Sequence, residues 1–182
     1  MKKISLISMV FAVVLFVASC GTKKDPNKTY LATATDYNNF IVGEQTKIVQ
    51  KMMSLSQMAG VTTPEQMTQA QKETIAQCDT SINATKKLAD FEGNVELRDG
   101  AVKLFEFYKS IISNEYAQMM TIVQKGAAIT PDDTTQLGKI QRSIAEKEKS
   151  FDQTFQSAQK AFAEKNKMKI EENQLQKELD KQ

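Results

Sequence analysis

The side chains that carry out most protein chemistry are sparse in this sequence. It contains no histidine and two cysteines, Cys20 and Cys78. Ser-His-Asp and Cys-His nucleophilic sites need an imidazole base, and ferritin-like di-iron bundles use Glu-x-x-His pairs, so these chemistries are excluded. Zinc sites built from cysteine and histidine are excluded as well, and the sequence has no Gly-rich phosphate loop and no CxxC pair. We therefore expect a protein that is not an enzyme and that has no metal site and no cofactor.

Cys20 follows a segment with the layout of a secretory signal peptide. Two lysines are followed by an almost wholly apolar run over residues 4–17, and then by the small residues Ala18 and Ser19. The apolar run is short for a membrane-spanning helix, which needs about 20 residues, so a retained anchor helix is the less favoured alternative. We expect residues 1–19 to be a signal peptide that is cleaved from the chain.

The letters "VASC", residues 17–20, resemble the lipobox of bacterial lipoproteins. The resemblance implies that diacylglycerol is attached to the Cys20 thiol, that the chain is cleaved before this residue, and that the new amino group is often acylated. Each buried CH2 contributes about 0.8 kcal/mol, and one acyl chain binds a bilayer only marginally, so two or three chains are needed for durable anchoring. We expect a membrane partner through the lipid on Cys20. Because Thr22 rather than Asp follows Gly21, the enteric signal for inner-membrane retention is absent, and we expect the outer membrane of a bacterial envelope, in either leaflet.

The chain after the signal peptide is electrically balanced. Two of the 24 basic residues lie in the signal peptide, which leaves 22 basic and 22 acidic side chains. Nucleic-acid-binding domains usually carry a basic patch, so we expect no nucleic-acid partner. Residues 20–28 form a short polar tether, and residues 29–166 are long enough for one domain with a hydrophobic core. With Cys20 lipidated, Cys78 has no partner for an intrachain disulfide.

Apolar residues recur in this domain at three- and four-residue intervals, which is the spacing of amphipathic helices. The spacing predicts four long helices, at about residues 29–59, 63–91, 95–125 and 130–165. The second and the fourth begin with "TPEQ" and "TPDD", in which Thr63 and Thr130 are the expected N-caps and proline takes the first helical position. Short connections make successive helices antiparallel neighbours, so we expect an all-α, up-down-up-down four-helix bundle. Residues 167–182 are highly charged and either extend the last helix or fray.

Some polar residues of the first helix fall on the face that is expected to be buried. Asn38 and Gln45 share a stripe with Ile41 and Ile48, and a buried amide costs stability unless it is hydrogen-bonded. We therefore expect these amides to have partners on a facing helix, where they either fix the register of the bundle or line a polar pocket. Cys78 lies on the apolar stripe of the second helix and is expected to be a small buried hydrophobe.

The start of the third helix carries a second polar group. Arg98 and Asp99 lie beside the turn that precedes the helix, and Tyr108 lies on its inward stripe. Phe107 cannot share that inward face equally well with Tyr108, so we expect it to be partly exposed. Gly100 is a poor helix former in the first turns and leaves the start of the helix open.

Three of these stretches, together with the lipobox, resemble a family of small surface lipoproteins found in spirochaetes and Bacteroidetes: "DYNNFIVGEQTKIV", "LRDGAVKLFEFYKSI" and "FQSAQKAFAEKN". The similarity extends from about Tyr37 to Asn166 and rests on helix-packing patterns without catalytic residues. It implies an α-helical lipoprotein of the cell envelope whose molecular role is undefined. The matching polar positions are Tyr37, Asn38, Gln45, Arg98, Asp99 and Tyr108, and the resemblance assigns none of them a reaction.

Two functions fit these observations. We favour a lipid-anchored, non-enzymatic module of the cell envelope that binds a protein partner or has a structural role. The alternative is a periplasmic bundle that holds a small molecule or a lipid between its helices, with Asn38, Gln45, Arg98 and Tyr108 lining the pocket. A cavity in the range of ligand sites, about 300–1,000 Å³, is required by the second function but not by the first.

Overall fold

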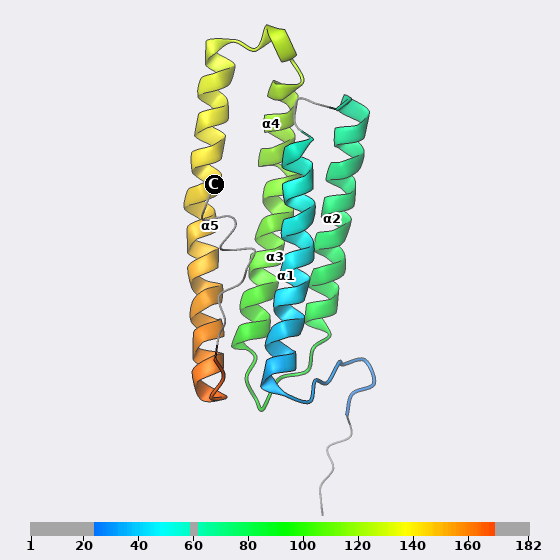
Figure 1. Cartoon of the computed structure of the whole chain (residues 1–182), viewed down its shortest axis with the longest axis vertical. Coiled ribbons are helices and arrows are strands. Elements are labelled where there is room, and N and C mark those ends of the chain that lie inside the picture. The colour runs from blue at the N-terminus through cyan, green and yellow to red at the C-terminus, as the bar shows by residue number, and fades with distance from the viewer. Residues whose placement is uncertain (1–23, 59–61, 170–182) are drawn as a thin grey trace, which may run out of the picture.

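The computed structural model describes residues 24–58 and 62–169, and within these ranges it contains helices and two isolated bridges but no strand. The helices are Ala34–Gln57 (α1), Pro64–Lys86 (α2), Glu96–Ser113 (α3), Glu115–Val123 (α4), the 3-10 turn Gly126–Ala128 (η1) and Pro131–Lys165 (α5), as Figure 1 shows. The predicted all-α bundle is therefore confirmed. The signal peptide, Cys20 and the tail from residue 170 onward lie outside the described residues.

The sequence signals at the starts of α2 and α5 act as predicted. The Thr63 hydroxyl accepts a hydrogen bond from the Gln66 N–H at 3.3 Å, and the Gln66 side chain accepts one from the Thr63 N–H at 3.0 Å. Thr130 and Asp133 form the same reciprocal capping box at the start of α5. A hydrogen bond from the Lys125 ammonium at 2.6 Å, followed by those from Thr130, lowers the pKa of Asp133 to about 2. Each box satisfies backbone amides that the first turn of a helix leaves without partners, which fixes where the helix begins.

The first helix begins at Ala34, later than the predicted start near Thr29. The Thr33 side chain caps it, and the residues before this cap run beside the end of α2. There the Thr29 N–H donates to the Lys87 carbonyl at 2.7 Å, and the Thr29 carbonyl accepts from the Ala89 N–H at 2.9 Å. These bonds occupy backbone groups that a longer α1 would use, and α2 stops short of its predicted end for the same reason.

The predicted third helix is interrupted at Asn114 and forms α3 and α4. Asn114 has a φ of −112°, well away from the regular helical value of about −63°, and its side-chain Nδ2 donates to the Ser110 carbonyl at 3.0 Å. A short amide side chain that bonds the preceding turn competes with the regular backbone hydrogen bonds of a helix. Because α4 resumes directly after Asn114, α3 and α4 still form one column of the bundle (Figure 1).

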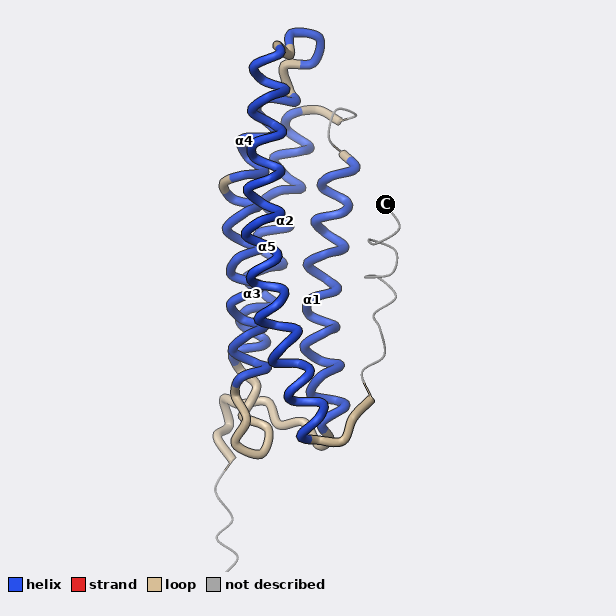
Figure 2. The backbone as a smooth tube through the Cα atoms, turned by 90° about the vertical axis from the view of Figure 1, so that its left-hand side faces the viewer, coloured by secondary structure: helices blue, strands red, loops and turns tan. Residues whose placement is uncertain are grey.

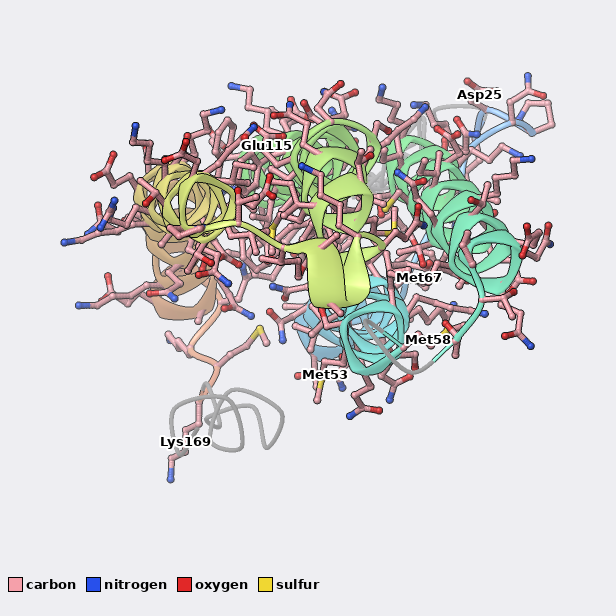
Figure 3. The ribbon with its side chains drawn as sticks, turned by 90° about the horizontal axis from the view of Figure 1, so that it is seen from above. Asp25, Met53, Met58, Met67, Glu115 and Lys169 are labelled. Atoms are coloured by element: carbon pink, nitrogen blue, oxygen red, sulfur yellow. The ribbon has the colours of Figure 1, made fainter. Side chains whose placement is uncertain are left out.

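The α3 helix is the centre of the bundle, because it packs against α1, α2 and α5. The α1 helix packs against α2 and α3, and α5 packs against α3 and α4, while α1 and α5 make at most sparse contact with each other. Figure 2 shows α1 and α5 as separate columns, and Figure 3 shows the same arrangement along the bundle axis. The bundle therefore has three helices, α1, α2 and α5, packed around the central α3–α4 column.

Cross-helix hydrogen bonds show how the helices run along one another. The pairs Glu44–Ser81 and Lys51–Glu73 link α1 to α2, and the pairs Asp79–Lys109 and Gln71–Ile112 link α2 to α3. In each case the residue numbers rise along one helix as they fall along the other. In Figure 1 the colours accordingly pass up α1, down α2, up α3 and α4, and down α5.

The core is built from the inward faces of all these helices. Fully buried side chains are Ile41, Ile48, Cys78, Leu88, Leu97, Leu104, Phe105, Ile112 and Phe162. Cys78 is therefore buried as predicted, and burial raises the pKa of its thiol to about 12. Among the described helices, none combines the length and the apolar character needed to cross a bilayer.

The expectation for Phe107 is wrong. This ring is buried because Phe151 of α5 stacks on it, with ring centroids 4.5 Å apart, and Phe151 itself is 37% exposed. The pattern of α3 alone predicts that Phe107 faces solvent, but α5 packs on that side of α3 and covers the ring.

Candidate functional site

A pocket of about 520 Å³ lies between α1, α4 and α5, at the end of the bundle where α2 begins. Its volume is within the range of small-molecule sites, about 300–1,000 Å³, and it is partly open to solvent. The lining residues are Leu55, Ser56, Met67, Tyr116, Met119, Met120, Val123, Leu137, Gln141, Ile144, Ala145 and Glu148. The site is therefore mainly apolar, with Glu148 as the charged residue of its described lining.

The pocket exists because α1 and α5 both pack on the α3–α4 column without closing on each other. The last turns of α1 and the first turn of α2 form one wall, to which α2 contributes Met67, labelled in Figure 3. The α4 helix supplies Met119 and Met120, and the first half of α5 forms the opposite wall. Methionine side chains are flexible and polarizable, so these walls can adapt to apolar groups of different shape.

Two hydroxyl groups and a carboxyl group give the pocket its polar points. The Ser56 hydroxyl and the Tyr116 hydroxyl lie 3.3 Å apart and link α1 to α4. Glu148 is the last of the α5 lining residues and the one nearest the middle of the bundle. A ligand in the pocket therefore meets hydroxyl groups on one side and a carboxyl group on another.

Glu148 has a second acid, Asp152, one turn further along α5. Burial, and next the charge of Asp152, raises the pKa of Glu148 above its usual value. Burial also raises the pKa of Asp152, although a hydrogen bond from Tyr108 acts in the opposite direction. Among the described residues, no lysine or arginine forms an ion pair with either acid. The middle of α5 therefore presents two half-buried acids next to an apolar pocket.

Four of the six residues singled out in the sequence lie at the other end of the bundle, where α1 and α3 begin: Tyr37, Asn38, Arg98 and Asp99. The Tyr37 hydroxyl donates to the Ala89 carbonyl at 3.2 Å, and burial raises its pKa to about 12. Arg98 donates to the Asp99 carboxylate at 2.8 Å and to the Leu88 carbonyl at 3.2 Å. These bonds fasten the loop after α2 to the starts of α1 and α3, which is a structural role.

One of the two amides of this set, Asn38, has a hydrogen-bond partner on another helix. Asn38 Oδ1 accepts a hydrogen bond from Gln159 Nε2 of α5 at 2.8 Å, which is a direct bridge between α1 and α5. Gln45 of α1 lies near the Tyr108 phenol of α3. Burial, with the charge of Asp152 next, raises the pKa of the Tyr108 phenol above its usual value. The Asn38–Gln159 bond helps to fix how α1 and α5 lie against each other at this end of the bundle, which fits the register role.

None of the six residues lines the pocket described above. The pocket was not recognised in the sequence because its large apolar residues, such as Leu55, Leu137 and Ile144, fall on stripes that also predict ordinary core packing. The spacing of Ile140, Ile144, Glu148 and Asp152 did contain a signal, since two acids continue an apolar stripe at four-residue intervals. Acidic side chains are rarely buried on an inward face unless they are paired. Glu148 and Asp152 therefore indicate that the middle of α5 differs from ordinary core packing.

The described residues show no group of three His, Cys, Asp or Glu side chains placed to hold a metal ion. The chain matches no protein-family model, no curated protein and no solved structure. The similarity to surface lipoproteins therefore stays a prediction from the sequence, and the proposals below are argued from the geometry of the bundle and from the residues around Cys20.

Proposed function

We propose that this chain is a lipid-anchored, non-enzymatic protein of the bacterial cell envelope that binds a ligand with an apolar body between its helices. The observation that carries the binding proposal is the pocket of about 520 Å³ with mainly apolar walls. Close-packed bundle cores contain few voids larger than a water molecule, so a cavity of this size is a feature that packing alone does not require. The anchor is carried by the residues "VASC", 17–20.

The proposed anchor and the pocket lie far apart along the bundle, which supports access to the pocket from the aqueous side. Thr29 is fastened to the end of α2, and only nine residues separate it from Cys20, a reach of at most about 30 Å. Leu55 lies 21 residues after the start of α1 at Ala34, which is a rise of roughly 32 Å along the bundle. The pocket is thus at the end of the bundle opposite the tether (Figure 1). A ligand would reach it from the aqueous side and not from the anchoring bilayer.

A neutral fluorescent probe, 1-naphthalenemethanol, tests the pocket. The sequence has no tryptophan, so naphthalene emission is read without that background. The full lipidated protein is placed in phosphatidylcholine nanodiscs, and binding to empty nanodiscs is subtracted. We expect saturable binding that Ala145→Phe abolishes, because Ala145 lines the pocket and a phenyl ring there fills it.

Ala161→Phe is the matched control, because Ala161 is an exposed residue of the same helix outside the lining. Absence of saturable binding to the parent protein, or equal loss in both variants, contradicts the binding proposal. Protease shaving of intact cells, with capture of neighbouring proteins, decides which leaflet the bundle faces and whether it has a protein partner. Cleavage of the body in intact cells indicates the surface leaflet, and protection indicates the periplasmic one.

A further inference from the structure

We propose that the pocket selects amphipathic cations, that is, molecules with an apolar body and one ammonium group that pairs with Glu148. This inference rests on the proposed binding function and adds the chemical class of the ligand. It follows from the charge at one end of the pocket, from the direction of the neighbouring lysine, and from the size of the apolar space.

The charge of the lining is negative. Glu148 is the charged residue of the described lining, and Asp152 lies one turn beyond it on the same helix. The neutral side chains of Gln45 on α1 and Tyr108 on α3 lie near this pair, and no described lysine or arginine forms an ion pair with either acid. A cation placed at this end of the pocket therefore meets carboxylate oxygens and no competing positive charge among the described side chains.

Two lysines flank Glu148 in the sequence, and neither forms an ion pair with it among the described residues. Lys149 is exposed, and Lys147 pairs with Glu115. Lys147 Nζ lies 2.8 Å from Glu115 Oε1, and this ion pair ties α5 to the first turn of α4. Figure 3 places Glu115 on the side of α4 away from α1, so the lysine is directed away from the pocket. The ammonium of Lys147 therefore does not neutralise Glu148, and a ligand has to supply the positive charge.

A ligand with both an ammonium group and an apolar body is expected to bind more tightly than a ligand with only one of these features. A half-buried carboxylate has lost part of its hydration, and an opposite charge within about 4–6 Å favours its ionised form. The apolar walls contribute in proportion to the surface that they remove from water. At about 30 Å³ per water-sized group, a volume of 520 Å³ accommodates an apolar body of roughly 15 heavy atoms.

Three naphthalene probes of similar size and different charge test the inference: 1-naphthylmethylammonium, 1-naphthalenemethanol and 1-naphthoate. Each is titrated against the lipidated full-length protein in zwitterionic phosphatidylcholine nanodiscs, with empty nanodiscs as the blank. We expect the cation to bind at least tenfold more tightly than the neutral alcohol, and the anion to bind most weakly. Glu148→Gln keeps the shape of the side chain and should bring the affinity of the cation to that of the alcohol.

Glu146→Gln is the matched control, because Glu146 is exposed on the same helix and does not line the pocket. It should leave the order of the three affinities unchanged. Equal binding of all three probes, blocked by Ala145→Phe, overturns the selectivity for cations but leaves the proposed binding function intact. A preference for the cation that survives Glu148→Gln overturns the role of this carboxylate. If the parent protein binds none of the probes, the proposed binding function itself fails.

Discussion

Gly100 offers a direct test of how α3 and α5 pack. The residue is buried in α3, and a Cβ added there would lie 3.6 Å from the Ala158 Cβ and 3.9 Å from the Phe155 Cα, which are ordinary contacts. Alanine in place of glycine inside a helix stabilises by about 1 kcal/mol, and burial of one more carbon adds about 0.8 kcal/mol. We therefore expect Gly100→Ala to raise the free energy of unfolding by about 1.8 kcal/mol.

Two other helical glycines separate the two contributions. A Cβ at Gly43 in α1 or at Gly138 in α5 meets nothing within 4 Å. Gly43→Ala and Gly138→Ala should therefore gain only the helix-propensity part, about 1 kcal/mol each. The additional increase in the free energy of unfolding at Gly100 then measures the contribution of the contact between α3 and α5.

The assay is urea denaturation followed by far-ultraviolet circular dichroism, which reports directly on an all-helical body. A larger side chain sharpens the test: Gly100→Leu should lower stability by about 1–3 kcal/mol, because it overpacks the contact. If Gly100→Ala is less stable than the parent protein while both control variants are more stable, α3 and α5 lie closer together than described. If Gly100→Leu is harmless, they lie further apart.

Three further variants probe the caps, the core and the buried acids. Thr130→Ala removes the N-cap of α5 and should lower the free energy of unfolding by about 1 kcal/mol in urea titrations, with Thr130→Ser close to the parent; equal stability of all three would exclude a capping role. Phe162→Ala removes a fully buried ring and should cost about 3–5 kcal/mol, much more than Phe151→Ala at a site that is 37% exposed. Because its folded pKa is raised, Asp152 favours the folded state most at acidic pH, and this stability is lost as the pH rises through that pKa. Asp152→Asn should therefore gain stability relative to the parent as the pH rises above about 4, the ordinary pKa of an aspartate, and a parallel pH profile for the two proteins would contradict the raised pKa.

Local signals in the sequence predicted most helix boundaries, because caps act within four residues. The pairs Thr63–Gln66 and Thr130–Asp133 begin α2 and α5 where the sequence places them. The start of α1 could not be predicted in this way, because Thr29 bonds to the end of α2, a contact between segments far apart in the chain.

The candidate site was predicted less well, because it depends on which helices are neighbours. Periodicity identifies an inward face but not the helix that covers it, so the stacking of Phe151 on Phe107 and the separation of α1 from α5 were not foreseen. Asn38 was correctly predicted to need a partner on a facing helix, since a buried amide must be hydrogen-bonded. Glu148 was missed, although an acid on an apolar stripe is a recognisable signal of a special environment.

The central claim is that Cys20 holds this helical bundle on a membrane. Metabolic labelling with an alkyne fatty acid, followed by membrane fractionation, tests it most directly in the parent protein and in Cys20→Ala. Cys78→Ala is the matched control, because Cys78 is buried in the core and has no role in anchoring. We expect the label and the membrane partition to be lost in Cys20→Ala and retained in Cys78→Ala. Label and partition that persist unchanged in Cys20→Ala would contradict the claim.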